Sequence, residues 1–448
     1  MRRLATAAGL TAVLGLGMLA LVGWTGGAGP AGRSQTKATT LTVWVGWSQR
    51  ELREFKKVVS EYDAKHSDVT IKVVGSINDD KITAAIRSGN APDVVSSFTS
   101  ANVGVYCGTG AWIDLASYLK KDNVDMSQFP KTSLYYTQYG GKRCALPLLA
   151  DSYGLYYNKT LFKKAGITRP PRTFSELTAD AKKLTQRGGD GSIKVAGYTP
   201  FFGFYSGNFA DMTNYAPLFK AQYLNAKGKS VISSRFAWSK LLRWQKNLID
   251  WYGYDKLVRF QSGLGDEFSA SNAFEVGKLA MLMDGEWRVA FIAAEHPNLN
   301  YATAPMPVDD AHPELYGAGS VNGTIIGIPK GGKHNDEAWA LVKYLTMDDH
   351  ALAKFSNGIR NVPSTRTSAK SPELKPDARF ATFVKIFNNP NSATAPITAA
   401  GNANLSLVGR FTVKWQAGKV KNLHDALKKL DKQIDAQNEQ AKKGGGVP

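Results

Sequence analysis

The segment YGGKRCALP at residues 139–147, followed by GLYYNKTLFKKAGI at residues 154–167, decides the fold of this chain. A turn at Gly140 and Gly141 leads into a short apolar run that ends at Pro147, and an aromatic run then leads into a basic helix start. Because proline cannot donate a backbone N–H to a sheet, the pattern predicts a strand that stops at Pro147 and resumes as another strand. Such a segment carries a chain from one lobe to another.

Length and composition describe an ordinary globular protein with room for two or three hydrophobic cores. The chain has 448 residues, of which 43% are hydrophobic and 21% are charged. Its formal charge is +19, from 56 basic and 37 acidic residues, yet Lys and Arg form no run of five or more. This spread favours a solvated basic surface over a nucleic-acid-binding surface, which would gather its charge in a patch.

The first residues have the pattern of an export signal. Arg2 and Arg3 precede an apolar stretch from Leu10 to Val22, which is short for a membrane span. We therefore expect a signal peptide over residues 1–31 and a flexible linker over residues 32–40.

One position in the signal decides how the protein is held after export. Leu21-Val22-Gly23 has the form of a lipoprotein cleavage box, but Trp24 stands where the lipid-bearing cysteine would be. We therefore expect a protein at the cell surface or in the extracytoplasmic space. Release after cleavage and retention through the apolar stretch both remain open.

The chain has two cysteines, Cys107 and Cys144. In an exported protein a single pair predicts a disulfide, here between the region after the third strand and the strand that ends at Pro147. The alternative is two buried thiols that serve as small apolar side chains.

Strands and helices alternate in the first part of the chain. Strands are predicted at residues 41–45, 69–74 and 91–95, with helices at about 48–65 and 82–89 between them. This order predicts a parallel sheet with helices on its faces. Two helix starts have the spacing of a capping box, namely Ser48 with Glu51 and Thr173 with Glu176.

Five short motifs, in the right order, resemble those of bacterial extracellular solute-binding proteins of the sugar type, which include maltose-binding proteins. They are the two segments quoted above, FEVGKLAM at 274–281, GEW at 285–287, and IPK at 328–330 with EAW at 337–339. The resemblance covers about residues 41–430. It implies an α/β fold with two lobes, of the type II periplasmic-binding-protein class, and a ligand cleft between lobes joined by hinge strands.

The resemblance and the element pattern together suggest limits for the lobes. Lobe 1 is expected from residues 41–149 and 304–345, and lobe 2 from residues 150–303 and 346–438. A terminal amphipathic helix is predicted because Leu423, Leu427, Leu430 and Ile434 recur at helical spacing. Residues 439–448 are expected to form a disordered tail.

The sequence offers no specific reason to expect an enzyme. The six histidines lack H-x-x-x-H spacing, and neither a G-x-S-x-G elbow nor a phosphate-binding loop occurs. Acidic pairs such as Asp309-Asp310 are adjacent in polar stretches, which favours the surface over glycosidase chemistry. We expect a binding protein that needs no cofactor or metal.

A sugar site needs flat aromatic walls for the ring face and a few fixed polar groups for the hydroxyls. Candidates follow strand ends, where open α/β sheets bind ligands, or lie at the hinge. The candidate ligand-binding residues are Trp47, Ser48, Ser97, Phe98, Thr99, Asp151, Tyr205, Asn208, Trp287, Arg288, Gly319, Ser320, Asn322 and Arg360. Trp287 is the strongest, because the resemblance places a stacking aromatic residue there. Asp151, Ser320 and Asn322 have an alternative role in turns.

The resemblance implies the substrate-binding component of an ABC importer for a sugar or oligosaccharide. Expected partners are a carbohydrate and the transmembrane permease subunits, with no nucleic acid, and the chain is expected to be a monomer. Two alternatives remain. One is a non-sugar solute such as a polyamine, which would need several cleft carboxylates where few candidates appear. The other is a secreted carbohydrate-active enzyme.

Overall fold

The computed structural model describes residues 38–201, 214–375 and 377–444. The expected signal peptide, Tyr205 and Asn208 lie outside these residues. The expected linker is shorter than predicted, because Thr39 and Thr40 already belong to the first strand. Over these described ranges, every helix is too short or too polar to cross a membrane.

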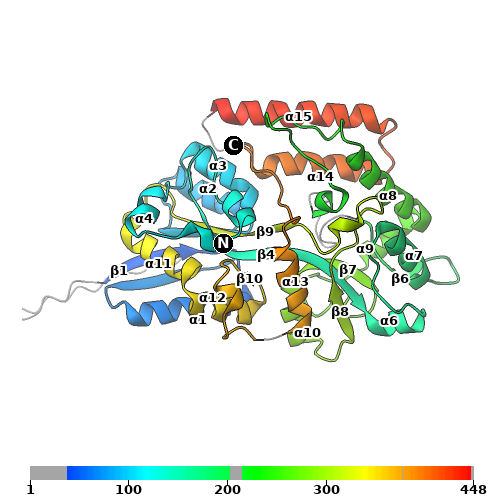
Figure 1. Ribbon diagram of the computed structural model, residues 1–448, viewed down its shortest axis with the longest axis horizontal. Helices are drawn as coiled ribbons and strands as arrows, with labels where there is room; N and C mark the ends of the chain where they lie inside the picture. Colours follow the sequence, from blue (N-terminus) through cyan, green and yellow to red (C-terminus); the bar gives the residue numbers. More distant parts are fainter. Residues whose placement is uncertain (1–37, 202–213, 376, 445–448) are drawn as a thin grey trace, which may run out of the picture. The chain divides into compact units, whose positions relative to one another are not determined.

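An eight-stranded sheet organises the described chain (Figure 1). Strand β1 (Thr39–Trp44) lies between β2 (Val69–Val74) and β3 (Val94–Ser97) and is parallel to both. Helices α1 (Gln49–Lys65) and α2 (Asp79–Arg87) connect them. The predicted parallel β–α–β–α–β unit is therefore confirmed.

Strand β4 (Leu146–Asn158) is the long strand that links the two halves of the sheet (Figure 1). It pairs antiparallel with β9 (Val321–Gly327) up to Ser152, and then with β7 (Met281–Gly285) from Tyr153 onward. Strand β8 (Tyr301–Ala304) joins it from Leu155, and β10 (Val362–Pro363) pairs with its first half.

The predicted strand break at Pro147 is wrong. Strand β4 runs through this residue, and a register shift between Pro147 and Leu149 accommodates the missing N–H. The change of neighbour occurs instead at Ser152 and Tyr153. The segment therefore does pass from one half of the sheet to the other, but as a single strand.

Three hydrophobic clusters fill the two halves. The first packs α1, α11 (Asn335–Met347) and α12 (Asp349–Ile359) against one face of β1, β3 and β9. The second covers the opposite face with α2 and α3 (Val103–Thr109). The third and largest surrounds β7, β8 and the second half of β4.

The remaining elements complete these halves. The first half also contains α4 (Ala116–Lys121) and α5 (Lys131–Tyr135). The second contains α6 (Lys159–Lys164), α7 (Phe174–Leu184), β5 (Gln186–Arg187), β6 (Ile193–Val195), α8 (Phe236–Tyr252), α9 (Tyr254–Ser262), α10 (Arg288–Glu295), α13 (Ala378–Asn388), α14 (Asn402–Gln416) and α15 (Leu423–Gly444).

A division by hydrophobic cluster differs from the expected lobe limits at two places. Met306, Val308 and Leu315 belong to the third cluster, so the chain returns to the first half with β9 rather than near residue 304. Leu352 and Phe355 of α12 belong to the first cluster, although residues from 346 onward were expected in lobe 2.

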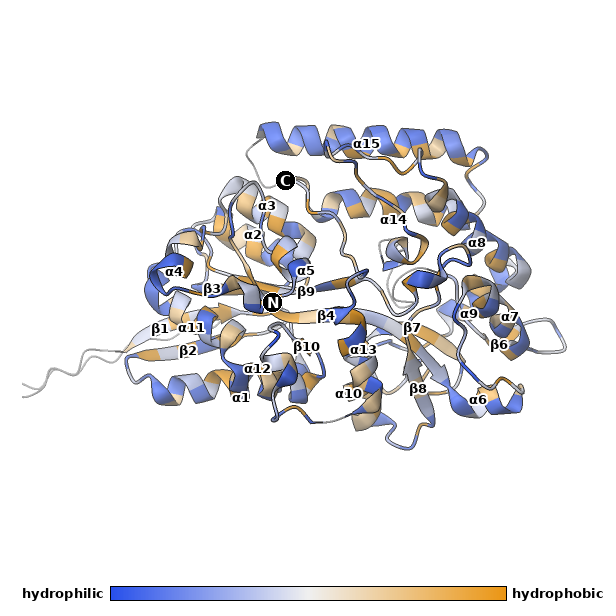
Figure 2. Cartoon of the chain, viewed as in Figure 1, coloured by the Kyte–Doolittle hydropathy of each residue, from blue (hydrophilic) through white to orange (hydrophobic). Residues whose placement is uncertain are grey.

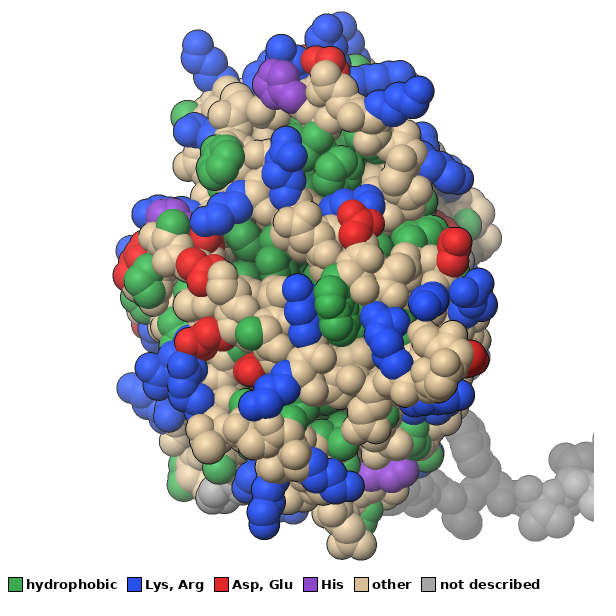
Figure 3. Space-filling view, turned by 90° about the vertical axis from the view of Figure 1, so that its right-hand side faces the viewer, with side chains coloured by type: hydrophobic (Ala, Val, Ile, Leu, Met, Phe, Trp, Pro, Cys, Tyr) green, Lys and Arg blue, Asp and Glu red, His purple; other side chains and the backbone are tan. Residues whose placement is uncertain are grey.

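Helix α15 forms as predicted, with Leu423, Leu427, Leu430 and Ile434 buried. It continues to Gly444, so residues 439–444 are helical where a disordered tail was expected. Its outer side is mostly hydrophilic, whereas apolar residues gather on the central strands (Figure 2). On the face shown in Figure 3, Lys and Arg are scattered with acidic residues among them.

The structure tests three further predictions, namely the two capping boxes and the disulfide. Ser48 makes no side-chain capping bond, so the first predicted capping box is wrong. At the second, Thr173 accepts from the Glu176 N–H, and the Glu176 carboxylate accepts from the backbone N–H groups of Thr173 and Arg172, so this predicted capping box forms. The Sγ atoms of Cys107 in α3 and Cys144 before β4 are bonded, with Cα atoms 5.5 Å apart.

Candidate ligand-binding site

A cavity of about 250 Å³ lies beside the point where β4 changes neighbour. Half of the residues that line it are aromatic, and the rest are carboxylic, amide or hydroxyl side chains. The lining residues are Trp47, Glu51, Phe98, Asp151, Tyr153, Phe268, Trp287, Asn322, Thr324 and Asn361.

One wall comes from the carboxyl ends of β1 and β3. These neighbouring parallel strands end at the same edge of the sheet, which brings Trp47 and Phe98 together. Their rings meet edge to face, with centroids 5.5 Å apart. Gly46 makes this possible, because a Cβ there would lie 2.4 Å from the Phe98 ring. Trp47 is buried, whereas Phe98 is 49% exposed and free to meet a ligand.

The opposite wall contains Trp287 and Tyr153. Trp287 follows β7 and immediately precedes α10, and its ring meets that of Tyr153 at 5.7 Å and 90°. The indole lies over Gly285, where a Cβ would come within 2.2 Å of the ring. Trp287 is half-buried, so part of the indole is covered by protein and part is available to the cavity.

The polar floor is built around Asn361. Its side-chain amide donates to Asp151 Oδ1 at 2.5 Å and to Glu286 Oε1 at 2.9 Å. The Ser152 N–H donates to Glu286 Oε2 at 2.8 Å. Burial raises the pKa of Asp151, and burial together with the neighbouring Asp151 charge raises the pKa of Glu286. The two carboxyl groups therefore retain protons above the usual carboxyl range.

Glu51 supplies a third carboxyl group, from the first turn of α1. Its side chain has no hydrogen bond or ion pair within the part of the chain that the structure describes. Burial raises its pKa, and the charges of Arg50 and Arg288 partly offset this effect. The first predicted capping box failed because this side chain lines the cavity.

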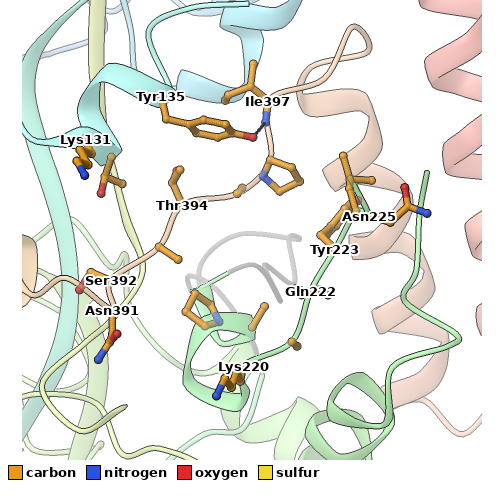
Figure 4. A pocket seen from close by; sticks show the side chains of 18 of the residues that line it. Lys131, Tyr135, Lys220, Gln222, Tyr223, Asn225, Asn391, Ser392, Thr394 and Ile397 are labelled. Carbon is orange, nitrogen blue, oxygen red and sulfur yellow. Dashed lines mark hydrogen bonds between the residues drawn. The ribbon is translucent and has the colours of Figure 1, made fainter. Parts of the chain in front are cut away.

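Two further cavities continue from the first. One of about 280 Å³ shares Phe98, Tyr153 and Asn322 with it and adds Thr99 and Ser320. The other, of about 960 Å³, shares residues 394, 395 and 397 with the second and is shown in Figure 4. There the Ile397 N–H donates to the Tyr135 hydroxyl at 3.3 Å. The second cavity is therefore adjacent to both the first and the third.

The structure brings together seven of the residues proposed from the sequence. Trp47, Phe98, Asp151, Trp287 and Asn322 line the first cavity, and Thr99 and Ser320 line the second. The Asn322 Oδ1 atom is buried and unpaired among the described residues, which leaves an acceptor for a ligand.

Five other candidates do not line these two cavities. Ser48 is exposed, and the Ser97 hydroxyl accepts from the Thr99 N–H. Gly319 lies against Ile386. The last two are arginines whose side chains are engaged elsewhere: Arg288 with Asp284 and Glu275, and Arg360 with the Lys375 carbonyl.

The sequence analysis missed Glu51, Tyr153, Phe268, Thr324 and Asn361. One signal could have found two of them. Tyr153 and Asn361 each lie within two residues of a position that was proposed. Phe268 belongs to a segment between α9 and β7 that has no strand end beside it, so no local pattern indicates its role.

Comparison with known proteins identifies the family. Residues 57–382 match the family described as bacterial extracellular solute-binding protein. This chain belongs to that family. A putative binding protein of Brucella abortus (strain 2308) is 26% identical over 350 residues, covering 77% of this chain and 80% of the relative. The maltooligosaccharide ABC transporter solute-binding lipoprotein of Streptococcus pneumoniae serotype 4 is 25% identical over 371 residues, or 80% of each chain.

Solved structures agree with the family. CpMnBP1 with mannotriose bound has a TM-score of 0.79 and 26% identity, and the match covers 88% of this chain and 100% of that one. Maltose-bound T. maritima MalE3 has a TM-score of 0.73 at 21% identity, covering 89% of this chain and 100% of that one, which supports the fold alone. The predicted α/β, two-lobed fold is confirmed.

Proposed function

We propose that this protein is the extracytoplasmic substrate-binding component of an ABC transporter and binds a sugar or oligosaccharide for import. One observation carries the proposal: aromatic rings face a cavity whose floor is carboxyl and amide groups. A sugar ring has apolar C–H faces that stack on aromatic rings and hydroxyls that need fixed hydrogen-bonding partners. The Asn361 and Asp151 side chains and the unpaired Asn322 Oδ1 supply such partners.

The two walls belong to different halves of the chain, which we propose are the two lobes. Trp47 and Phe98 extend from β1 and β3, whereas Trp287 follows β7. A ligand that contacts both walls binds the closed arrangement better than the open one and so shifts the population toward it. Strand β4, which pairs on both sides of Ser152, is the proposed hinge.

We propose that the site binds without catalysis and without a metal or cofactor. Asp151 and Glu286 both accept from one amide group of Asn361, so this pair of carboxyl groups does not flank a glycosidic bond from two sides as a glycosidase pair does. The proposed partners are the transmembrane subunits of a permease, with the protein acting as an exported monomer that binds no nucleic acid.

A thermal-shift screen of the purified protein against a carbohydrate panel tests this function, followed by calorimetry on each hit. We expect at least one mono- or oligosaccharide to raise the melting temperature in a concentration-dependent manner. Chromatography of the ligand after incubation should recover it unchanged. Cleaved products would instead identify a carbohydrate-active enzyme, and a panel without any hit would reject sugar binding.

A further inference from the structure

The first cavity is acidic in a strongly basic protein. The chain carries a formal charge of +19, yet Lys, Arg and His are absent from the described residues that line the first and second cavities. The ionisable groups in their linings are the carboxyl groups of Glu51 and Asp151. Glu286 shares the Asn361 amide with Asp151 and is fully buried. The ionisable groups of the cavity are therefore acidic, whereas the molecule as a whole is basic.

The nearest cations are engaged behind the cavity walls. Arg50 donates to the Gly358 carbonyl, and its guanidinium lies 4.8 Å from the Phe291 ring. Arg288 is held by Asp284 and Glu275 in a fully buried cluster that also includes the charge of Glu267. Because these arginines have their own partners, neither forms an ion pair with a carboxyl group of the lining.

Buried carboxylates without a cationic partner are unfavourable in the empty protein. Asp151 is 9% exposed, and its hydrogen-bond partners are the Asn361 amide and the Glu286 carboxyl group. Glu51 has no hydrogen-bond or ion-pair partner in the described chain, although the charges of Arg50 and Arg288 act on it. A cation brought by the ligand would favour the ionised form of both groups and pair with it. The surrounding rings add to this preference, because the faces of Trp, Tyr and Phe attract cations.

We propose that the saccharide bound by this site carries a protonated amino group, as in a glucosamine oligomer, and that the ammonium lies between Glu51 and Asp151 against the aromatic walls. This inference rests on the proposed function and narrows its ligand class. The sugar rings stack on Trp287 and Phe98, while the ammonium supplies the charge that a neutral sugar lacks. N-acetylation of the same sugar removes this charge and adds bulk.

Calorimetry with three trisaccharides tests the proposal: the glucosamine trimer, its N-acetylated form and neutral mannotriose. Near pH 6, at which an amine with a pKa near 8 is protonated, we expect the glucosamine trimer to bind at least about tenfold more tightly than either neutral sugar. Binding should also release protons, because the ammonium favours the ionised carboxyl groups. Titration in two buffers of different ionisation enthalpy measures this release.

A pair of variants on one helix separates the charge from other effects. Glu51→Gln keeps the shape and should reduce the ratio of the amine affinity to the neutral-sugar affinity toward one. Glu54→Gln is the matched control, because Glu54 lies one turn later in α1 and its carboxylate bonds to Lys57. This control should leave the ratio unchanged.

The outcomes distinguish the inference from the proposed function. If a neutral trisaccharide binds as tightly as the glucosamine trimer, the inference fails and the proposed function stands. If spermidine binds and all three trisaccharides do not, the ligand is an aliphatic amine and both fail. If Glu51→Gln leaves the affinity ratio of the wild type intact, Glu51 does not contact the ammonium and the placement is refuted.

Discussion

Replacement of Trp287 by alanine is the most direct test of where the ligand binds. The indole forms one wall of the cavity, and half-burial against Tyr153 and Gly285 holds it in place. A tryptophan side chain can bury about 150–250 Å². If a sugar ring covers about 80 Å² of it, at about 25 cal/mol per Å², the contact contributes about 2 kcal/mol. Trp287→Ala should therefore weaken saccharide binding by roughly 30-fold.

The assay is calorimetry with the best saccharide from the screen, on wild type and variant. Circular dichroism and a melting curve show whether the variant is folded. Trp251→Ala is a matched control, because Trp251 lies on α8, is 37% exposed and does not line the cavity. Trp287→Phe should retain part of the affinity through its smaller ring. A folded Trp287→Ala protein that binds within about threefold of wild type would refute this placement of the site.

Three further predictions address the disulfide, the buried carboxyl groups and the hinge. Reduction of the Cys107–Cys144 disulfide, whose cysteines are 37 residues apart, should lower the free energy of unfolding by about 4 kcal/mol in denaturant titrations. Two alkylatable thiols in the native protein would show that the disulfide does not form. Burial raises the folded-state pKa of Asp151 and Glu286, so above about pH 4 the folded protein binds more protons than the unfolded chain. The free energy of unfolding should therefore fall as the pH rises toward 7. The slope should be at most about 1.4 kcal/mol per pH unit for each carboxyl group. Asp151→Asn should flatten this slope in pH-dependent melts, and an unchanged slope would assign it to other groups. Saturating ligand should reduce the radius of gyration in small-angle scattering, whereas an identical profile would count against lobe closure.

The sequence predicted those parts of the fold that depend on neighbours along the chain. The alternation of strands and helices from Leu41 to Val95 implies parallel pairing, since each helix returns the chain to the same edge. The apolar spacing of Leu423 to Ile434 similarly predicted a helix with one buried face. By contrast, the strand break expected at Pro147 did not occur. A register shift against β9, which lies far away in the sequence, accommodates the proline.

The structure brings roughly half of the candidate residues to the first two cavities, and this pattern has a physical cause. Trp47, Phe98 and Thr99 lie together because residues after parallel strands converge at one sheet edge. For Trp287 and Arg288, the position in the sequence does not decide which side chain faces the cavity. They are adjacent in the sequence, yet one lines the cavity while the other is buried among Asp284 and Glu275. Which of two neighbours faces a cavity depends on the elements packed against them.

The sequence alone determined the family, the α/β alternation, the terminal helix and the single disulfide that two cysteines can form. These properties follow from local periodicity, ordered motifs and composition. Only the tertiary structure decided that Glu51, Asp151, Glu286 and Asn361 meet at one place, because they come from α1, β4 and two separate loops. The acidic character of the site follows from that meeting. A chain of formal charge +19 can enclose an acidic cavity because net charge is a sum over the whole surface, whereas a ligand responds to the few groups within its reach.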